Sequence, residues 1–130
     1  MILKNHKTSD NTQWYKIFDT EQDAYASVPV NSFYTLRFGF TKVCIIHLKK
    51  GLFAIEDACP HKLIPLSKGC INEQDQIVCM SHQYTFDLKT GEEMTGKNIR
   101  NVKTFPLEVR DDGIYLGLPV KTSPKDDFSY

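Results

Sequence analysis

Residues 59–91, which decide the fold, read CPHKLIPLSKGCINEQDQIVCMSHQYTFDLKTG. This stretch holds two short half-sites, each with one cysteine and one histidine: Cys59 with His61, and Cys79 with His82. Zinc fingers usually pair Cys with Cys and His with His within a half-site. Mixed half-sites suit a two-iron cluster instead, because one iron can then bind both thiolates and the other both imidazoles. The pattern therefore predicts a [2Fe–2S] cluster on these four side chains, and a zinc-bound structural module is the alternative.

Short β-strands are predicted around this stretch. Apolar and polar residues alternate from Tyr34 to Phe40, which is the pattern of a half-buried strand. Lys49-Lys50-Gly51 and Asp111-Asp112-Gly113 each separate two β-rich runs, as hairpin turns do, and a positive φ suits Gly51. A short helix is predicted over residues 20–26. The predicted strands are 34–40, 43–48, 52–55, 76–79, 84–88, 105–110 and 114–118. Many short strands with regular turns predict an all-β sandwich or small barrel.

Length and composition fit a single globular domain. The 130 residues, 41% of them hydrophobic and 25% charged, are enough to form one modest core. We expect the domain to cover residues 13–122. Residues 1–12 and 123–130 are polar and lack periodicity, so flexible tails are expected there.

The charge and hydropathy patterns exclude several classes of function. Sixteen basic and sixteen acidic residues cancel, so no net field attracts nucleic acid or an anionic membrane. The start of the chain turns polar after two apolar residues, and no segment approaches the roughly 18 apolar residues of a membrane span. We therefore expect a cytoplasmic protein with reduced cysteines, which favours metal binding over disulfides.

The other cysteines and histidines are expected to lie outside the site. Cys44 alternates with apolar residues in a predicted strand, and Cys70 follows the first half-site, so both are expected to be small core residues. His47 shares a strand face with Val43 and is interpreted as a core or edge histidine. His6 lies in a polar segment, and no role is expected for it.

The two half-sites and the residues around them resemble the Rieske ferredoxins that serve bacterial ring-hydroxylating oxygenases. The Rieske domain of NAD(P)H-dependent nitrite reductase small subunits is similar. The resemblance runs from about Trp14 to Leu118 and is specific over residues 56–91. It implies an antiparallel β-sandwich or barrel with a small two-loop subdomain that binds one cluster. It also implies that the two cysteines bind the inner iron and the two histidines the outer iron.

Several positions depart from the family pattern. Gln83 stands where relatives commonly have Gly, and Leu63 and Ile64 stand where small residues are common. High-potential members carry an extra Cys in each loop, at positions matching Ile64 and Ser81. They also carry Ser and Tyr hydroxyls that bond the sulfurs, at the positions of Tyr84 and Phe86. The resemblance therefore implies a low potential, near the bottom of the roughly −150 to +300 mV range of the class.

The chain is predicted to carry electrons and to have no catalytic residues of its own. A Rieske oxygenase needs a second domain with a mononuclear iron, and only His6 and His47 remain outside the half-sites. The predicted role is one-electron transfer from a flavoprotein reductase to a terminal oxygenase. The alternative is a small subunit of a reductase such as nitrite reductase. We expect a monomer.

An apolar docking patch is predicted around the two histidines. Lys62 and Lys68 edge this patch, which suits transient contact with a partner protein. Its predicted members are Leu63, Ile64, Pro65, Leu66 and Met80.

Overall fold

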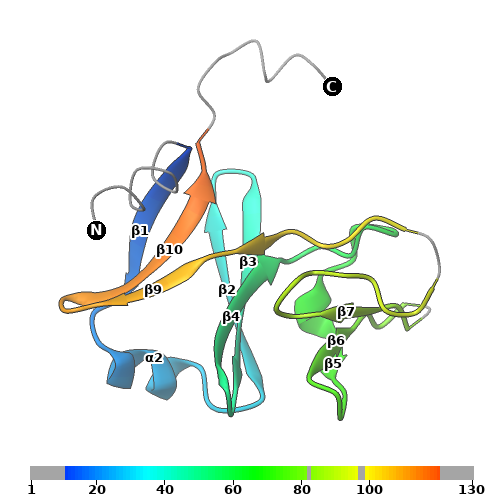
Figure 1. Cartoon of the computed structure of the whole chain (residues 1–130), viewed down its shortest axis with the longest axis horizontal. Coiled ribbons are helices and arrows are strands. Elements are labelled where there is room, and N and C mark those ends of the chain that lie inside the picture. Colours follow the sequence, from blue (N-terminus) through cyan, green and yellow to red (C-terminus); the bar gives the residue numbers. More distant parts are fainter. Residues whose placement is uncertain (1–10, 82, 97–98, 121–130) are drawn as a thin grey trace.

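Three antiparallel sheets make up the computed structural model, which describes residues 11–81, 83–96 and 99–120 (Figure 1). Their strand orders are β1-β10-β9, β2-β3-β4-β8 and β5-β6-β7. The strands are β1 (Thr12–Phe18), β2 (Ser32–Phe38), β3 (Thr41–Leu48), β4 (Gly51–Glu56), β5 (Cys70–Ile71), β6 (Gln76–Val78), β7 (Thr85–Asp87), β8 (Thr104–Phe105), β9 (Leu107–Arg110) and β10 (Gly113–Pro119). The helical segments are α2 (Glu21–Ser27) and the 3-10 helix η1 (Leu66–Lys68). The predicted all-β class is confirmed.

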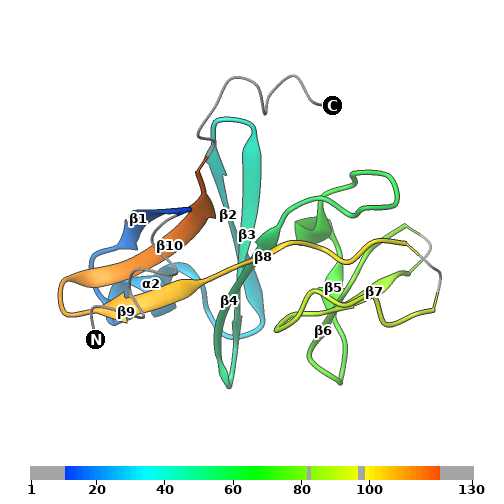
Figure 2. The same ribbon diagram turned by 45° about the horizontal axis from the view of Figure 1, so that its top comes forward.

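The two larger sheets form one half of the molecule, which we call the base. The base consists of β1–β4, β8–β10 and α2. The described residues between 57 and 103 form the other half. We call it the inserted region because it leaves the base after β4 and returns to it at β8. Figures 1 and 2 both show β5, β6 and β7 beside the base rather than within it.

Turn chemistry explains why the hairpins of the base were predictable. The β3–β4 hairpin turns at Lys49, Lys50 and Gly51, and Gly51 has a φ of 141°. Gly113 has a φ of 151° and begins β10 after the predicted Asp111-Asp112-Gly113 turn. Only glycine adopts such angles readily, so each glycine marks a point where the chain must reverse.

The helix prediction is also confirmed. α2 begins after Thr20, whose side-chain Oγ1 accepts a hydrogen bond from the backbone N–H of Asp23 at 3.0 Å. A threonine in this capping position satisfies one of the free N–H groups of the first turn. Ala24 of the helix is fully buried, as is Val28, which follows its last residue.

Two residues of the predicted strand 34–40, Gly39 and Phe40, lie outside the sheet. β2 ends at Phe38, and Gly39 (φ 64°) starts the turn to β3. Phe40 therefore sits at the tip of this turn and is fully exposed, at 101%. The prediction that it belongs to a half-buried strand face is wrong, because the alternation continues in the sequence past the point where the backbone turns.

Strand β3 separates two apolar clusters. Cys44 and Ile46 point into a cluster that includes Cys59, Cys79 and Phe86 of the inserted region. The alternate residues Val43 and Ile45 point into a second cluster between the two sheets of the base. All four β3 side chains named here are fully buried. Burying an Ile or Val side chain contributes about 1.5–3 kcal/mol, so this strand ties the inserted region to the base.

Among the described residues, no helix has the length and apolar character needed to cross a membrane. Of the two predicted tails, only Asn11 and Thr12 lie within the described residues, and Thr12 begins β1. The rest of both tails falls outside them.

Candidate metal centre

The first candidate loop, residues 59–64, follows β4 and ends just before η1. Cys59 is fully buried at its start. The backbone N–H of Cys59 donates to the carbonyl of Ile64 at 2.8 Å, and the N–H of Leu63 donates back to the carbonyl of Cys59 at 2.6 Å. Leu63 has a φ of 59°, in the left-handed region that non-glycine residues rarely adopt.

The second candidate loop, residues 79–84, joins β6 to β7 and repeats this backbone pattern. Cys79 is fully buried, and its N–H donates to the carbonyl of Tyr84 at 2.8 Å. The residue before that carbonyl, Gln83, has a φ of 57°. In both loops a cysteine N–H therefore binds the carbonyl five residues later, and the fourth residue after the cysteine is left-handed. The two half-sites are alike in backbone as well as in composition.

The structure brings the two loop cysteines together. Burial raises the pKa of the Cys59 thiol to about 11, the backbone N–H of His61 lowers it, and hydrogen bonding with Cys79 raises it again. The two thiols are thus close enough to interact inside an apolar cluster. A pair of buried, adjacent thiols can supply two ligands to one metal, with proton release on binding.

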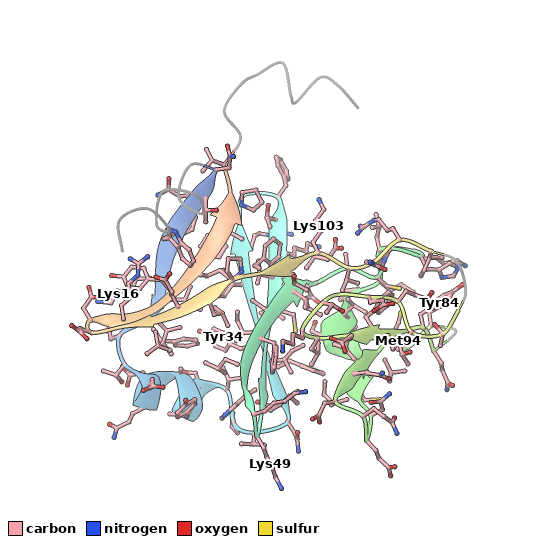
Figure 3. The ribbon with its side chains drawn as sticks, in the orientation of Figure 1. Lys16, Tyr34, Lys49, Tyr84, Met94 and Lys103 are labelled. Carbon is pink, nitrogen blue, oxygen red and sulfur yellow. The ribbon has the colours of Figure 1, made fainter. Side chains whose placement is uncertain are left out.

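His61 lies against the second loop. Its ring centroid is 4.6 Å from that of Tyr84, and its Nδ1 atom is buried. Figure 3 labels Tyr84 and shows it in the inserted region, on the opposite side of the molecule from Lys16 of the base. His82, the fourth predicted ligand, lies outside the described residues. Within the part of the chain that the structure describes, no three His, Cys, Asp or Glu side chains converge as around a single metal ion.

Two glycines allow the inserted region to fold tightly around these loops. A Cβ on Gly69 would lie 1.8 Å from the carbonyl oxygen of Val78, so only glycine permits this approach of η1 to β6. Gly91 has a φ of 80°, and a Cβ there would lie 2.1 Å from the carbonyl oxygen of Val102. Both positions are close backbone contacts that a side chain would prevent.

A charged pair fastens the end of the inserted region to β4. The guanidinium of Arg100 donates to both carboxylate oxygens of Glu56, from Nη1 at 2.7 Å and Nη2 at 3.2 Å. The backbone N–H of Lys103 donates to the same carboxylate at 2.8 Å. Hydrogen bonding to Glu56 raises the pKa of Arg100, burial lowers it, and the charge of Glu56 raises it, as a Cys59 thiolate would also do. Arg100 is therefore a cation near the cysteine pair.

The remaining candidates have structural positions. Cys44 is buried in the core, as predicted. His47 is half-buried, its Nδ1 is 2.6 Å from the carbonyl of Val28, and its ring stacks on Tyr25 at 4.8 Å, which confirms a satisfied histidine. Cys70 is exposed, so its prediction as a core residue is wrong. β5 is only two residues long and turns Ile71, not Cys70, toward the core. His6 lies outside the described residues.

The predicted apolar patch is partly right. Leu63 and Met80 are 68% and 60% exposed, and Lys62 and Lys68 are also exposed. Ile64 and Pro65 are half-buried. Leu66 is fully buried in the apolar cluster under the loops, so its placement in the patch is wrong. Leu66 begins the 3-10 helix η1, which turns its side chain inward. The spacing of apolar residues in the sequence did not predict this short helix.

Comparison with known proteins identifies the family. The family model described as Rieske [2Fe–2S] domain matches residues 13–106. The 3-phenylpropionate/cinnamic acid dioxygenase ferredoxin subunit of Photorhabdus laumondii is 28% identical over 74 residues, which cover 57% of this chain and 70% of that protein. The nitrite reductase [NAD(P)H] of Emericella nidulans is 33% identical over 99 residues, but these cover only 9% of that much longer protein.

The fold agrees with this match. A chain in the complex of reduced oxygenase and oxidised ferredoxin in carbazole 1,9a-dioxygenase superimposes with a TM-score of 0.68 at 22% identity, covering 85% of this chain and 97% of that one. The paired cysteine loops, the antiparallel sheets and the family match agree. The chain belongs to the Rieske [2Fe–2S] domain family.

Proposed function

We propose that the chain binds one [2Fe–2S] cluster on Cys59, His61, Cys79 and His82 and transfers single electrons between proteins. The main support for this proposal is the pair of buried cysteine thiols on two loops of the same backbone geometry. Each loop has a hydrogen bond from the cysteine N–H to the carbonyl five residues later and a left-handed residue at the fourth position after the cysteine. A histidine follows each cysteine, so each loop offers one thiolate and one imidazole. This donor set fits a Rieske cluster.

The residues of the site would divide into two roles. The fully buried Cys59 and Cys79 would hold the inner iron, and the half-buried His61 and its counterpart His82 would hold the outer iron nearer to the surface. The cluster supplies reversible one-electron chemistry when it is bound. Neutral imidazoles in place of two thiolates reduce its negative charge, so the protein accepts an electron more readily than an all-cysteine site.

The surroundings favour a potential at the low end of the Rieske range. Phe86 is fully buried in the same apolar cluster as the two cysteines and offers no hydroxyl to a sulfur. The ring of Tyr84 lies against that of His61, with the centroids 4.6 Å apart and the ring planes tilted by 55°. Donors that bond a thiolate sulfur withdraw negative charge and raise the potential, so a phenylalanine in this position keeps the potential low.

The proposed partners are a flavoprotein reductase as donor and a terminal oxygenase as acceptor. The similarity to a dioxygenase ferredoxin subunit and to the ferredoxin in the carbazole 1,9a-dioxygenase complex supports the oxygenase as acceptor. The reductase as donor follows from the family resemblance alone. The match to a nitrite reductase supports the alternative, a redox domain or subunit of such a reductase. In either system the chain would move electrons and leave the substrate chemistry to its partner.

The proposed contact surface surrounds the exposed Leu63. A groove of about 450 Å³ adjoins this residue, and the exposed Phe40 forms part of its lining. The exposed Lys42 and Lys103 also line it. Glu56 and Asp57 line it too, but Arg100 pairs with the first carboxylate and Ser67 binds the second. Apolar side chains edged by basic groups suit a partner that presents apolar side chains flanked by carboxylates.

The direct test is chemical analysis of the anaerobically purified protein. The proposal predicts red-brown absorption, with two irons and two acid-labile sulfides per chain. A colourless protein containing one zinc per chain would replace the proposal with the structural-module alternative. Size-exclusion chromatography with the native partners separates the two electron-transfer roles, because a shuttling ferredoxin elutes alone and a subunit co-elutes.

A further inference from the structure

Asp57 is the one buried charged residue among those that the structure describes, at 6% exposure. It follows the last residue of β4 and precedes Cys59 by two positions. A carboxylate removed from water is unfavourable unless other groups bind it, so its burial beside the proposed ligands calls for a structural cause.

Both carboxylate oxygens of Asp57 bind one residue across the first loop. Oδ1 accepts the backbone N–H of Ser67 at 2.8 Å, and Oδ2 accepts the Ser67 hydroxyl at 2.9 Å. The N–H of Asp57 itself donates to the carbonyl of Lys42 in β3 at 2.9 Å. The side chain thus joins the two ends of the segment that carries Cys59 and His61, and the backbone anchors that junction to the base.

The neighbouring Glu56 provides a contrast. Its carboxylate is paired with the guanidinium of Arg100 at 2.7 Å, so a cation balances its charge. No ion pair within the described residues includes Asp57, whose two partners are neutral donors. The negative charge of Asp57 therefore has no cation bonded to it. Lys42 and Lys103 share its groove, but both are exposed, so water screens their effect on it.

That charge lies close to the first ligand loop. Asp57 precedes Cys59 by two residues, and its carboxylate binds Ser67, which follows Leu66 of the apolar cluster that contains Cys59 and Cys79. A negative charge in this position disfavours an added electron on a cluster that these cysteines hold.

We propose that Asp57 is a positioning residue that closes the first ligand loop on Ser67, and that its uncompensated charge lowers the reduction potential of the cluster. The effect on the reduction potential rests on the proposed cluster, whereas the closing of the loop does not. The closing of the loop is a property of the chain itself and can be measured without iron.

Three variants separate the two effects. Asp57→Asn keeps an acceptor for the Ser67 N–H and removes the charge, so the cluster should load as in the wild type. Its equilibrium constant for reduction should rise at least threefold, which is about 28 mV at 59 mV per tenfold change for one electron. Asp57→Ala removes the closure, so cluster content should fall at least threefold. Ser67→Ala keeps the charge of Asp57 but removes the hydroxyl, one of the two groups that donate hydrogen bonds to its carboxylate. The midpoint potential of this variant should therefore fall slightly.

The readouts are cluster content by visible absorption, midpoint potential by voltammetry, and hydrogen exchange of the Ser67 amide in iron-free protein. That amide should be protected in the wild type and should exchange at least tenfold faster in Asp57→Ala. A potential of Asp57→Asn equal to that of the wild type would overturn the charge effect. Full cluster content together with unchanged Ser67 exchange in Asp57→Ala would overturn the positioning effect.

Two further outcomes remain decisive. If Asp57→Asn yields no folded protein, Ser67→Ala tests the charge effect, and an unchanged or raised potential contradicts it. If the wild type itself contains no iron, the proposed cluster fails, whereas the exchange of the Ser67 amide still tests the loop closure.

Discussion

The base and the inserted region are built by different means. β3 of the base has eight residues and pairs over seven positions with β2 and over six positions with β4. In the inserted region β5 has two residues, and β6 and β7 have three each. Turns, side-chain clasps and close glycine contacts hold the rest of that region. Long ladders with a shared core are stable without a ligand, whereas short strands between loops depend more on whatever the loops bind.

The largest effect expected from this difference is the loss of the cluster on removal of a ligand. Cys59→Ala, Cys79→Ala or His82→Ala should abolish the red-brown absorption and the low-g electron paramagnetic resonance signal of the reduced protein. Thermal stability should fall as well, because metal binding stabilises the loops. Cys70→Ser, which changes an exposed thiol outside the site, is the control and should keep a normal spectrum. A normal spectrum from any of the three ligand variants contradicts the assignment.

Removal of iron should loosen strands β6 and β7 of the inserted region and spare the base, while the hydrogen bond to Asp57 keeps the Ser67 amide protected. After chelation, the amides of Ile77 and Phe86 on the paired β6 and β7 should exchange on the order of a hundredfold faster. Those of Ile45 and Ile46 in β3 should keep their protection, because their ladders and both apolar clusters remain. Hydrogen exchange followed by NMR measures each amide. Equal loss of protection in both regions would show that the base also depends on the cluster.

Changes on the surface of the two regions should differ in their effect on electron transfer. Leu63→Asp, in the proposed contact surface, should slow the reaction with the electron donor about tenfold, since a charge replaces an apolar contact. Val109→Asp is the matched control, because Val109 is 59% exposed but lies on β9 of the base. Stopped-flow kinetics gives both rates, with the visible spectrum as a check on cluster content. If Val109→Asp slows the reaction and Leu63→Asp does not, the partner docks on the base.

The smallest predicted effect concerns the strained backbone of the second loop. Gln83 has a φ of 57°, and the left-handed conformation costs a non-glycine residue about 1–2 kcal/mol. Gln83→Gly should therefore raise the free energy of unfolding by about 0.5 kcal/mol, after the greater freedom of glycine in the unfolded chain is subtracted. Gln74→Gly, at an exposed position without a positive φ, should lower it instead. Denaturant unfolding of both holoproteins tests the pair.

The parts of the fold that the sequence predicts are those with local causes. The hairpins at Gly51 and Gly113 and the helix after Thr20 each follow from a residue with a strong conformational preference. β1 has no such signal. Its pairing with β10 shifts register between Lys16 and Phe18, and this irregularity breaks the two-residue period by which strands are found.

The candidate site likewise combines features that have a local cause in the sequence with features that do not. The four predicted ligands follow from residue type and spacing, and the structure places Cys59 and Cys79 together. The clasp between Asp57 and Ser67 was not predicted, because the two residues meet only through the turn at η1. The left-handed backbone conformation of Leu63 was also not predicted. For Gln83 the sequence held an indication of a positive φ, because relatives commonly have Gly at this position.

The most direct test of the proposed ligand set is the midpoint potential of the wild-type protein at neutral pH, measured by voltammetry. Two histidines on one iron and a phenylalanine at position 86 predict a value near the bottom of the Rieske range, about −150 mV. A value near −400 mV, as in plant-type ferredoxins, would show that the histidines do not bind the cluster. A value well above zero would show that donors to the sulfurs exist in spite of Phe86.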